Sequence, residues 1–235
     1  MHALEAEDVQ KSFGSFSALR GMTLQVPRGE FLAIFGANGA GKTTFLKVCS
    51  TLLRPTKGRL RIEGLDIREQ PEAVRRNLGF LSHNTYLYRD LSPIENLRLF
   101  AALYGIDKPG ERIESMIARV GLKSRANDPV RSFSRGLQQR LGVARAVLHS
   151  PSLVLLDEPY TGLDANAADT LNALLDELHL QGKTVILTSH DLDQGLRSAS
   201  RAVIIDRGKA VFDGTASDPA VRDAYQKYVR RGAER

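Results

Sequence analysis

A glycine-rich segment near the start of the chain has residue types and spacing suited to phosphate binding. It follows the apolar run 31–35, precedes a predicted helix from Thr44 to Leu53, and consists of Gly36, Ala37, Asn38, Gly39, Ala40, Gly41, Lys42, Thr43 and Thr44. Such a loop points its backbone N–H groups at a phosphate, and the helix N-terminus adds partial positive charge. In this pattern Lys42 reaches the β- and γ-phosphates and the Thr43 hydroxyl ligates Mg²⁺. The segment predicts a nucleotide-phosphate site, with a plain glycine turn as the alternative.

Two adjacent acidic residues form the second group that could take part in a reaction. Asp157 and Glu158 follow the apolar run 153–156, which predicts a buried parallel strand. Ligands of open α/β sheets bind at the carboxyl ends of the strands. Asp157 is expected to hold Mg²⁺ directly or through water, and Glu158 to take a proton from an attacking water. A helix cap is the alternative for such a pair, and the phosphate loop favours catalysis.

A third segment, residues 133–140, predicts the start of a helix that continues to Leu148. Its sequence is Phe-Ser-Arg-Gly-Leu-Gln-Gln-Arg, and Ser134 is a residue type that commonly caps a helix N-terminus. Taken alone, this is an ordinary helix start. In this order with the other two segments, it resembles the signature loop of the ABC ATPase family, usually written LSGGQ followed by QQR. The chain is thus similar, over nearly its whole length, to the ATP-binding subunits of ABC transporters.

The resemblance implies an α/β fold. Its core is a P-loop NTPase (RecA-like) domain with a parallel sheet, joined by an N-terminal antiparallel β subdomain and an inserted helical subdomain. Residues 1–235 form one ABC ATPase domain in this interpretation. Residues 1–85 and 150–235 make the nucleotide-binding core with its antiparallel β piece, and residues 86–149 make the helical subdomain that carries the signature loop.

The resemblance also implies further site residues. Phe13 matches the aromatic that stacks on adenine, although Phe16 is a rival and a core position is the alternative. Asp164, in the sequence Thr-Gly-Leu-Asp, belongs to the loop that couples the two active sites of a dimer. His190 follows the apolar run 184–189 and matches the histidine that contacts the γ-phosphate and orders the attacking water.

The resemblance implies a mechanism that needs partners. Two ATPase chains, expected to be identical, pack head to tail, so that Ser134 and Gly136 act on the ATP bound by the other chain. ATP with Mg²⁺ holds the pair together, and hydrolysis opens it. Integral membrane permease subunits use this motion for transport. The chain is therefore expected to lie at the cytoplasmic face of a bacterial inner membrane, held there by these subunits.

Two positions depart from the family pattern. His83 replaces the usual glutamine that contacts Mg²⁺ and water and senses the membrane partner. Because imidazole is a poor ligand for Mg²⁺, His83 is expected to act through a water or only as a coupling residue, with the Asn84 amide as a substitute. Arg135 replaces the first signature glycine, where it adds positive charge beside the γ-phosphate of the other chain or points to solvent.

The rest of the sequence indicates how these groups are positioned. Residues 4–27 and 58–67 predict antiparallel strands, and 202–211 predict a hairpin with its turn at 207–208. Residues 90–149 have helical periodicity, and Ser92, Pro93 and Glu95 predict a capped helix start. A terminal helix that frays into a basic end is expected from residue 218.

An apolar and aromatic group at the start of the helical region has two interpretations. It consists of Tyr86, Leu87, Tyr88 and Leu91. The group is expected to form a docking groove for a helix of a partner protein, and buried core is the alternative.

Composition limits the possible classes of protein. The chain has 235 residues, of which 42% are hydrophobic, enough for one composite domain with a sizeable core. It has no apolar run of about 18 residues, so a soluble cytosolic chain is expected. The single cysteine, Cys49, fits a reducing compartment. The net charge of +6 is spread over 33 basic and 27 acidic residues, so no nucleic-acid partner is expected.

The transported cargo is predicted from a resemblance in three segments. His83 with its neighbours, the segment 91–97 and the signature segment 133–140 are similar to the ATP-binding subunit of the bacterial haem exporter of cytochrome c maturation. A drug, lipid or antibiotic exporter subunit is the alternative. A soluble ABC ATPase of DNA repair or translation is a third class, but such proteins carry long coiled coils or two tandem cassettes, and this chain has one cassette and no heptad run.

Overall fold

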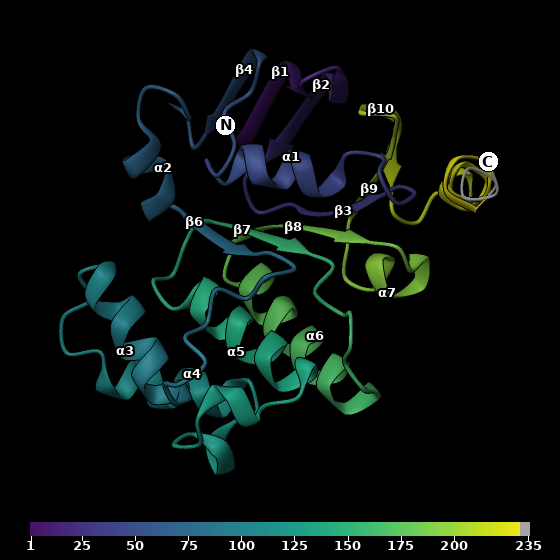
Figure 1. The fold of residues 1–235 in the computed structure, drawn as a ribbon. Coiled ribbons are helices and arrows are strands. Elements are labelled where there is room, and N and C mark those ends of the chain that lie inside the picture. The colour runs from purple at the N-terminus through teal and green to yellow at the C-terminus, as the bar shows by residue number, and fades with distance from the viewer. Residues whose placement is uncertain (231–235) are drawn as a thin grey trace.

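A six-stranded sheet forms the centre of the molecule in the computed structural model, which describes residues 1–230 (Figure 1). The strands in spatial order are β10 (Lys209–Thr215), β9 (Arg201–Asp206), β3 (Phe31–Phe35), β8 (Thr184–Ser189), β7 (Leu153–Asp157) and β6 (Leu78–Leu81). All neighbouring strands pair in parallel except β10, which forms an antiparallel hairpin with β9. The fold is thus α/β with a sheet of mainly parallel strands, as predicted.

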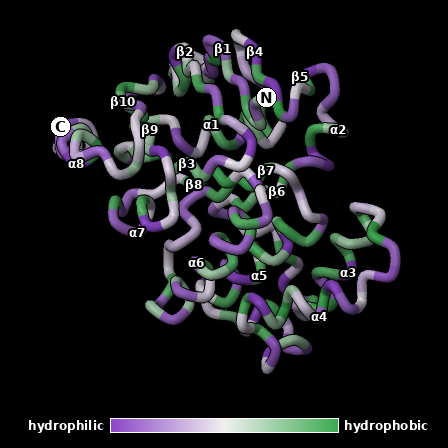
Figure 2. The backbone as a smooth tube through the Cα atoms, turned by 180° about the vertical axis from the view of Figure 1, so that it is seen from behind, coloured by the Kyte–Doolittle hydropathy of each residue, from purple (hydrophilic) through white to green (hydrophobic). Residues whose placement is uncertain are grey.

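The central strands are apolar on both faces because both faces are covered. In β3, Leu32 and Ile34 belong to one core cluster, while Ala33 and Phe35 belong to the other. This alternation follows from the two-residue period of a strand, and continuous apolar runs are typical of parallel strands buried on both sides. Figure 2 shows hydrophobic segments in the central sheet and in the helices packed on it.

A second, four-stranded sheet covers one face of the molecule. Its spatial order is β2 (Phe16–Pro27), β1 (His2–Phe13), β4 (Lys57–Ile62) and β5 (Leu65–Asp66), and all its pairings are antiparallel. Helix α1 (Lys42–Cys49) lies between this sheet and the central sheet (Figure 1). The predicted antiparallel β subdomain is therefore confirmed.

Two helices, α5 (Arg135–Val147) and α6 (Ala165–Leu180), pack on the opposite face of the central sheet. Helices α3 (Pro93–Leu103) and α4 (Gly110–Arg119) pack against α5, with the short 3₁₀ helices Lys123–Arg125 and Val130–Ser132 between α4 and α5. The capping box at α3 is present, since Ser92 and Glu95 exchange hydrogen bonds across the first turn. Ser134 caps α5 through its hydroxyl, which accepts from Leu137 N.

Shorter helices complete the chain. These are α2 (Pro71–Arg76), α7 (Leu192–Leu196), α8 (Ala220–Tyr225) and a π-helical segment, Gln226–Arg230. The predicted basic end beyond Arg230 lies outside the described residues. Among residues 1–230, no helix combines the length and apolar character needed to cross a membrane.

Helix α1 differs from its predicted span of residues 44–53. It starts at Lys42 because Gly41 takes a left-handed conformation, with φ of 111°, at the N-cap. It ends at Cys49, and Thr51 has φ of 64°, a left-handed conformation that a helix cannot continue. The helix therefore places the Lys42 backbone N–H, as well as its side chain, at the first turn.

The hairpin between β9 and β10 reaches the phosphate loop. Its turn residues, Arg207 and Gly208, have φ of 46° and 77°, as a two-residue hairpin turn requires. Gly208 N donates to Ala40 O at 2.8 Å, and Gly208 O accepts from Arg20 N at 3.0 Å. A Cβ at Gly208 would lie 2.5 Å from Ala18 O. The turn thus fixes the loop against β2.

We expect Gly208→Ala to destabilise the protein more than Gly182→Ala does. Both glycines have left-handed φ, which costs a non-glycine residue about 1–2 kcal/mol. Only Gly208 is also crowded, because nothing lies within 4 Å of the Cβ position at Gly182. The free energy of unfolding should fall by about 1–3 kcal/mol more in Gly208→Ala than in Gly182→Ala, the usual cost of overpacking. Urea denaturation measures this free energy for both variants, and equal losses would contradict the close contact at Gly208.

Candidate active site

The predicted phosphate loop lies at the carboxyl end of β3 and lines a cavity of about 240 Å³. The lining consists of residues 37–44 together with Phe16, Ala18 and Glu158. Gly36 lies just outside this lining. A Cβ at Gly36 would be 2.5 Å from Ile205 O, and one at Gly41 would be 2.8 Å from Ala18 O. Glycine is therefore required where the loop passes close to β9 and β2.

Lys42 lies inside the loop that precedes it. Its ammonium donates to Gly36 O at 2.6 Å and to Ala37 O at 3.3 Å, and it lies 3.9 Å from Glu158 Oε1. The side chain is only 7% exposed. Burial lowers the pKa of Lys42, while Glu158 and Asp157 act in the opposite direction. A cation held in this cavity is suited to a phosphate, whose charge offsets the cost of burial.

Asp157 and Thr43, the predicted Mg²⁺ ligands, are in direct contact. The Thr43 hydroxyl donates to Asp157 Oδ1 at 3.1 Å, although the two residues come from α1 and the end of β7. Thr188, at the end of β8, donates to the same oxygen at 2.8 Å and accepts from Glu158 N at 3.0 Å. Hydroxyl and carboxylate oxygens suit Mg²⁺, so this pair fits the metal.

Glu158 and His190, the predicted catalytic residues, meet at the ends of β7 and β8. His190 Nδ1 lies 2.7 Å from Glu158 Oε2, and His190 N donates to the same oxygen at 3.2 Å. An ionised carboxylate only accepts, so Nδ1 donates, and Nε2 forms no hydrogen bond within residues 1–230. Glu158 has φ of 52°, a left-handed backbone that a glutamate rarely adopts and that is more common at functional sites.

The C-terminal helix holds the backbone of the histidine loop. The Tyr225 hydroxyl, at the end of α8, donates to His190 O. Its ring packs edge-on against Phe35 of β3, with centroids 5.8 Å apart, and burial raises the pKa of Tyr225. Tyr225 therefore joins α8 to His190, the residue that contacts Glu158.

The two candidate adenine-stacking residues have different surroundings. Phe16 lines the phosphate-loop cavity and is 59% exposed. Phe13 is 48% exposed, does not line that cavity, and has the Lys11 ammonium 5.0 Å from its ring centroid. The geometry therefore favours Phe16, the rival in the sequence interpretation, as the aromatic surface beside the phosphate loop.

The residues predicted to act on the other chain's ATP do not line the phosphate-loop cavity. Ser134 is exposed at the N-cap of α5, and Gly136 packs against Gly162, where a Cβ would lie 3.0 Å from Gly162 O. Asp164 caps α6, since its Oδ1 accepts from Ala167 N at 2.8 Å. Within one chain these residues form a separate surface beside the loop that follows β7.

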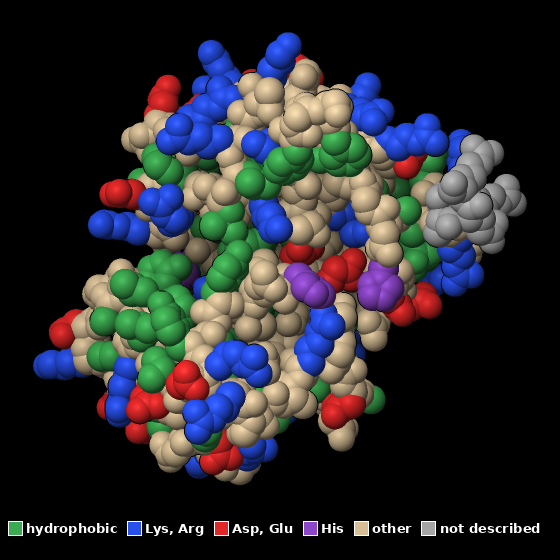
Figure 3. Space-filling model, in the orientation of Figure 1, with side chains coloured by type: hydrophobic (Ala, Val, Ile, Leu, Met, Phe, Trp, Pro, Cys, Tyr) green, Lys and Arg blue, Asp and Glu red, His purple; other side chains and the backbone are tan. Residues whose placement is uncertain are grey.

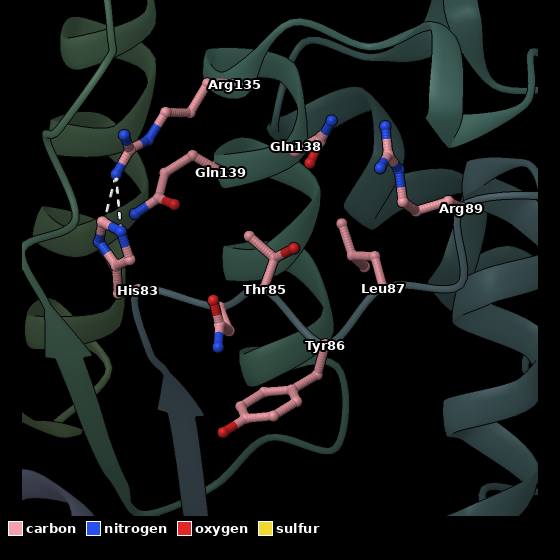
Figure 4. Close-up of a pocket in the computed structure, with 9 residues that line it drawn as sticks. His83, Thr85, Tyr86, Leu87, Arg89, Arg135, Gln138 and Gln139 are labelled. Carbon is pink, nitrogen blue, oxygen red and sulfur yellow. Dashed lines mark hydrogen bonds between the residues drawn. The ribbon is translucent and has the colours of Figure 1, made fainter.

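His83 contacts Arg135, the other departure from the family pattern. Arg135 Nη2 lies 3.2 Å from Nδ1 and 3.3 Å from Nε2 of His83 (Figure 4). A guanidinium only donates, so the imidazole nitrogen that carries a lone pair is the acceptor in this contact. Among residues 1–230, no cluster of three or more His, Cys, Asp or Glu side chains suited to a metal occurs. The structure thus shows Arg135 as a partner of His83, and the role of His83 near Mg²⁺ stays a prediction.

Sequence reasoning missed three residues that support the site. Thr188 donates to Asp157, the predicted Mg²⁺ ligand, Tyr225 holds the histidine loop, and Gln139 donates to Pro159 O at 3.2 Å. A signal existed only for Thr188, because a hydroxyl near the end of an otherwise apolar strand lies at the edge where ligands bind. Gln139 and Tyr225 contact residues at least 19 positions away, which no local pattern reveals.

Comparison with known proteins gives the family. A family model described as "ABC transporter" matches residues 19–161. The chain is 35% identical to the daunorubicin resistance ATP-binding protein DrrA3 of Streptomyces coeruleorubidus, covering 92% of this chain and 69% of that protein. It is 36% identical to the Nod factor export ATP-binding protein I of Cupriavidus pinatubonensis, covering 92% and 67%.

A solved structure agrees with these relatives. The fold matches the ATP-binding cassette MJ0796, solved as a dimer in a post-hydrolysis state bound to ADP and Pi, with a TM-score of 0.84. The two are 26% identical, and the match covers 92% of this chain and 99% of that one. This chain belongs to the ABC transporter family of ATP-binding proteins. It is accordingly an ATPase, as its paired phosphate loop and acidic strand end predict.

We expect Tyr225→Phe to reduce kcat for ATP hydrolysis about three- to tenfold, with little change in KM for ATP. The change removes one hydrogen bond, worth about 0.5–1.5 kcal/mol, from the loop that positions His190. Steady-state ATPase assays separate the two constants. Tyr228→Phe is the control, because no hydrogen bond by the Tyr228 hydroxyl occurs within residues 1–230. An equal loss in both variants would contradict a specific role for Tyr225.

Proposed function

We propose that this chain is the ATP-binding subunit of an exporter and works as a head-to-tail pair with an identical chain. The observation that carries the proposal is the separation of the site into two surfaces. One holds the phosphate loop with Asp157, Glu158 and His190. The other holds Ser134 and Gly136, which do not line the phosphate-loop cavity. A second copy supplies the missing surface, and the dimer reported for MJ0796 supports this arrangement.

The residues of one chain have distinct tasks in ATP hydrolysis. Lys42 and the loop N–H groups bind the β- and γ-phosphates, and Phe16 offers a face to the base. Glu158 accepts the proton of the water that attacks the γ-phosphorus, while the bond to the ADP oxygen breaks. His190 orients this water through its free Nε2. Thr43 and Asp157 would hold Mg²⁺, which when bound would supply positive charge beside the phosphates.

The second chain contributes a helix N-terminus. Ser134 caps α5, so this end of the helix carries partial positive charge and unpaired backbone N–H groups. Placed opposite the phosphate loop, it binds the γ-phosphate from the other side. The pair therefore closes on ATP and opens when the phosphate leaves.

The docking surface for a permease subunit lies between the core and the helical layer. A cavity of about 360 Å³ is lined by His83, Asn84, Thr85, Tyr86, Leu87, Arg89, Arg135, Gln138 and Gln139 (Figure 4). Tyr86 in this lining is 47% exposed, and Tyr88, two residues further along the chain, is 54% exposed. Leu103 at the end of α3 is 70% exposed. Figure 3 shows hydrophobic side chains gathered over α3. Such a surface suits an amphipathic helix of a membrane partner at the cytoplasmic face of the inner membrane.

The cargo is proposed from the relatives. The two compared above are named for daunorubicin resistance and for Nod factor export, so we propose an exporter of a drug-like or lipid-like organic molecule. The predicted haem export for cytochrome c maturation receives no support from these names. The soluble class without a membrane partner is disfavoured by the match to a transporter family model.

We expect Glu158→Gln to abolish turnover and to accumulate an ATP-dependent dimer. Loss of a general base typically costs about 10²–10⁴-fold in rate, while the neutral amide leaves ATP binding intact. Size-exclusion chromatography with and without Mg-ATP shows the dimer, and an ATPase assay shows the loss.

Two further variants make this test decisive. Ser134→Arg in the Glu158→Gln background should abolish the dimer, because it places a bulky cation at the helix N-terminus that faces the second chain. Glu69→Gln, at an exposed position outside both proposed surfaces, should change neither turnover nor dimerisation. A Glu158→Gln chain that binds ATP and remains monomeric at high concentration would contradict the proposed pair.

A further inference from the structure

The two departures from the family pattern contact each other, although they are 52 positions apart. The guanidinium of Arg135 bonds the imidazole of His83 at 3.2 Å. The residues that the family usually has here cannot make this contact, because glycine at position 135 has no side chain. One contact therefore accounts for both unusual residues.

Arg135 also contacts a third loop. Its aliphatic stem covers Gly162, where a Cβ would lie 3.1 Å from Arg135 Cδ and 3.3 Å from Arg135 Cγ. Gly162 has φ of 80° and lies between the acidic end of β7 and the start of α6. Gly136, next to Arg135, packs against the same residue from the helix backbone. The space around Gly162 is thus filled by the first residues of α5.

These contacts connect two functional surfaces through one side chain. His83 and Arg135 line the cavity proposed as the permease docking site. Gly162 and Gly136 lie on the surface proposed to face the second ATPase chain. Figure 4 shows the arginine extending from the start of α5 to the histidine at the edge of the cavity.

We propose that Arg135 is a positioning residue that transmits occupancy of the docking cavity to the dimer-forming surface. This inference rests on the proposed function. A helix that enters the cavity displaces His83 and frees the guanidinium. The stem of Arg135 then shifts on Gly162, and the close packing between Gly162 and Gly136 carries the shift to the N-terminus of α5. The planar guanidinium gives the contact a defined direction, which a lysine ammonium lacks.

The first test is a double-mutant cycle in the Glu158→Gln background. The measured quantity is the dissociation constant of the ATP-dependent dimer. His83→Ala should raise this constant about two- to tenfold when Arg135 is present, the range for loss of one hydrogen bond. In an Arg135→Gly chain the same change should alter it by less than about twofold. Effects that simply add would overturn the coupling.

Arg89→Gln provides a matched charge control. Arg89 lines the same cavity, but only its backbone carbonyl forms a hydrogen bond within residues 1–230. The effect of His83→Ala should persist in the Arg89→Gln chain. If Arg89→Gln removes that effect as Arg135→Gly does, the cause is the positive charge of the cavity and not the specific contact.

The second test fills the cavity directly. Asn84→Cys places a thiol beside His83, and a bulky maleimide attached there acts as the occupant. Native Cys49 is fully buried, and burial strongly raises the pKa of its thiol, so it does not compete for the label. Labelling should change the dimer dissociation constant at least about twofold with Arg135 present and leave it unchanged in Arg135→Gly. Equal changes in both chains would overturn the inference.

A measurement on the nucleotide-free chain tests this inference independently of the proposed ATP-dependent dimer. If Glu158→Gln forms no dimer, the proposed function fails. Backbone hydrogen exchange of segments 83–87 and 161–164 in the nucleotide-free chain still tests whether Arg135 holds these two segments in place. Arg135→Gly should accelerate exchange in both segments, and Arg89→Gln in neither. Unchanged exchange in Arg135→Gly would overturn the role of Arg135.

Discussion

The buried carboxylate of Asp157 is the interaction on which the arrangement of the site depends. One oxygen, Oδ1, accepts from Thr43 at the start of α1 and from Thr188 at the end of β8, while Asp157 itself ends β7. Three elements that are distant in sequence are thereby held at one edge of the sheet. Because the side chain is only 2% exposed, both bonds form in a low-dielectric environment, where a lost partner is costly. The positions of Glu158 and Lys42 follow from this junction.

The extent to which the sequence predicted the structure depended on how local each signal was. The apolar runs 31–35 and 153–156 were predicted as strands and lie in strands β3 and β7. They were recognisable because a strand buried on both faces has a continuous apolar sequence. The start of α1 was predicted two residues late, since a left-handed glycine at the N-cap is not distinguishable from a glycine in the loop. Phe13 and Phe16 flank one turn, and only the three-dimensional structure shows which faces the cavity.

Contacts between distant segments could not be predicted in this way. His83 and Arg135 were each recognised as unusual, yet their pairing depends on how α5 lies against the end of β6. A resemblance to a family gives the usual residue at each position. It does not show that two unusual residues compensate for one another, because that information lies in the packing between subdomains.

The turn between β9 and β10 has a consequence for protein engineering. Two-residue hairpin turns at a surface are favoured places to insert a peptide or a whole domain. Here the Gly208 amide bonds Ala40 of the phosphate loop, so an insertion at 207–208 would displace the nucleotide-binding backbone. The loop at Gly182 also contains a left-handed glycine, but its Cβ position is open. A reporter domain would therefore be accommodated at Gly182 and would disable the ATPase at Gly208.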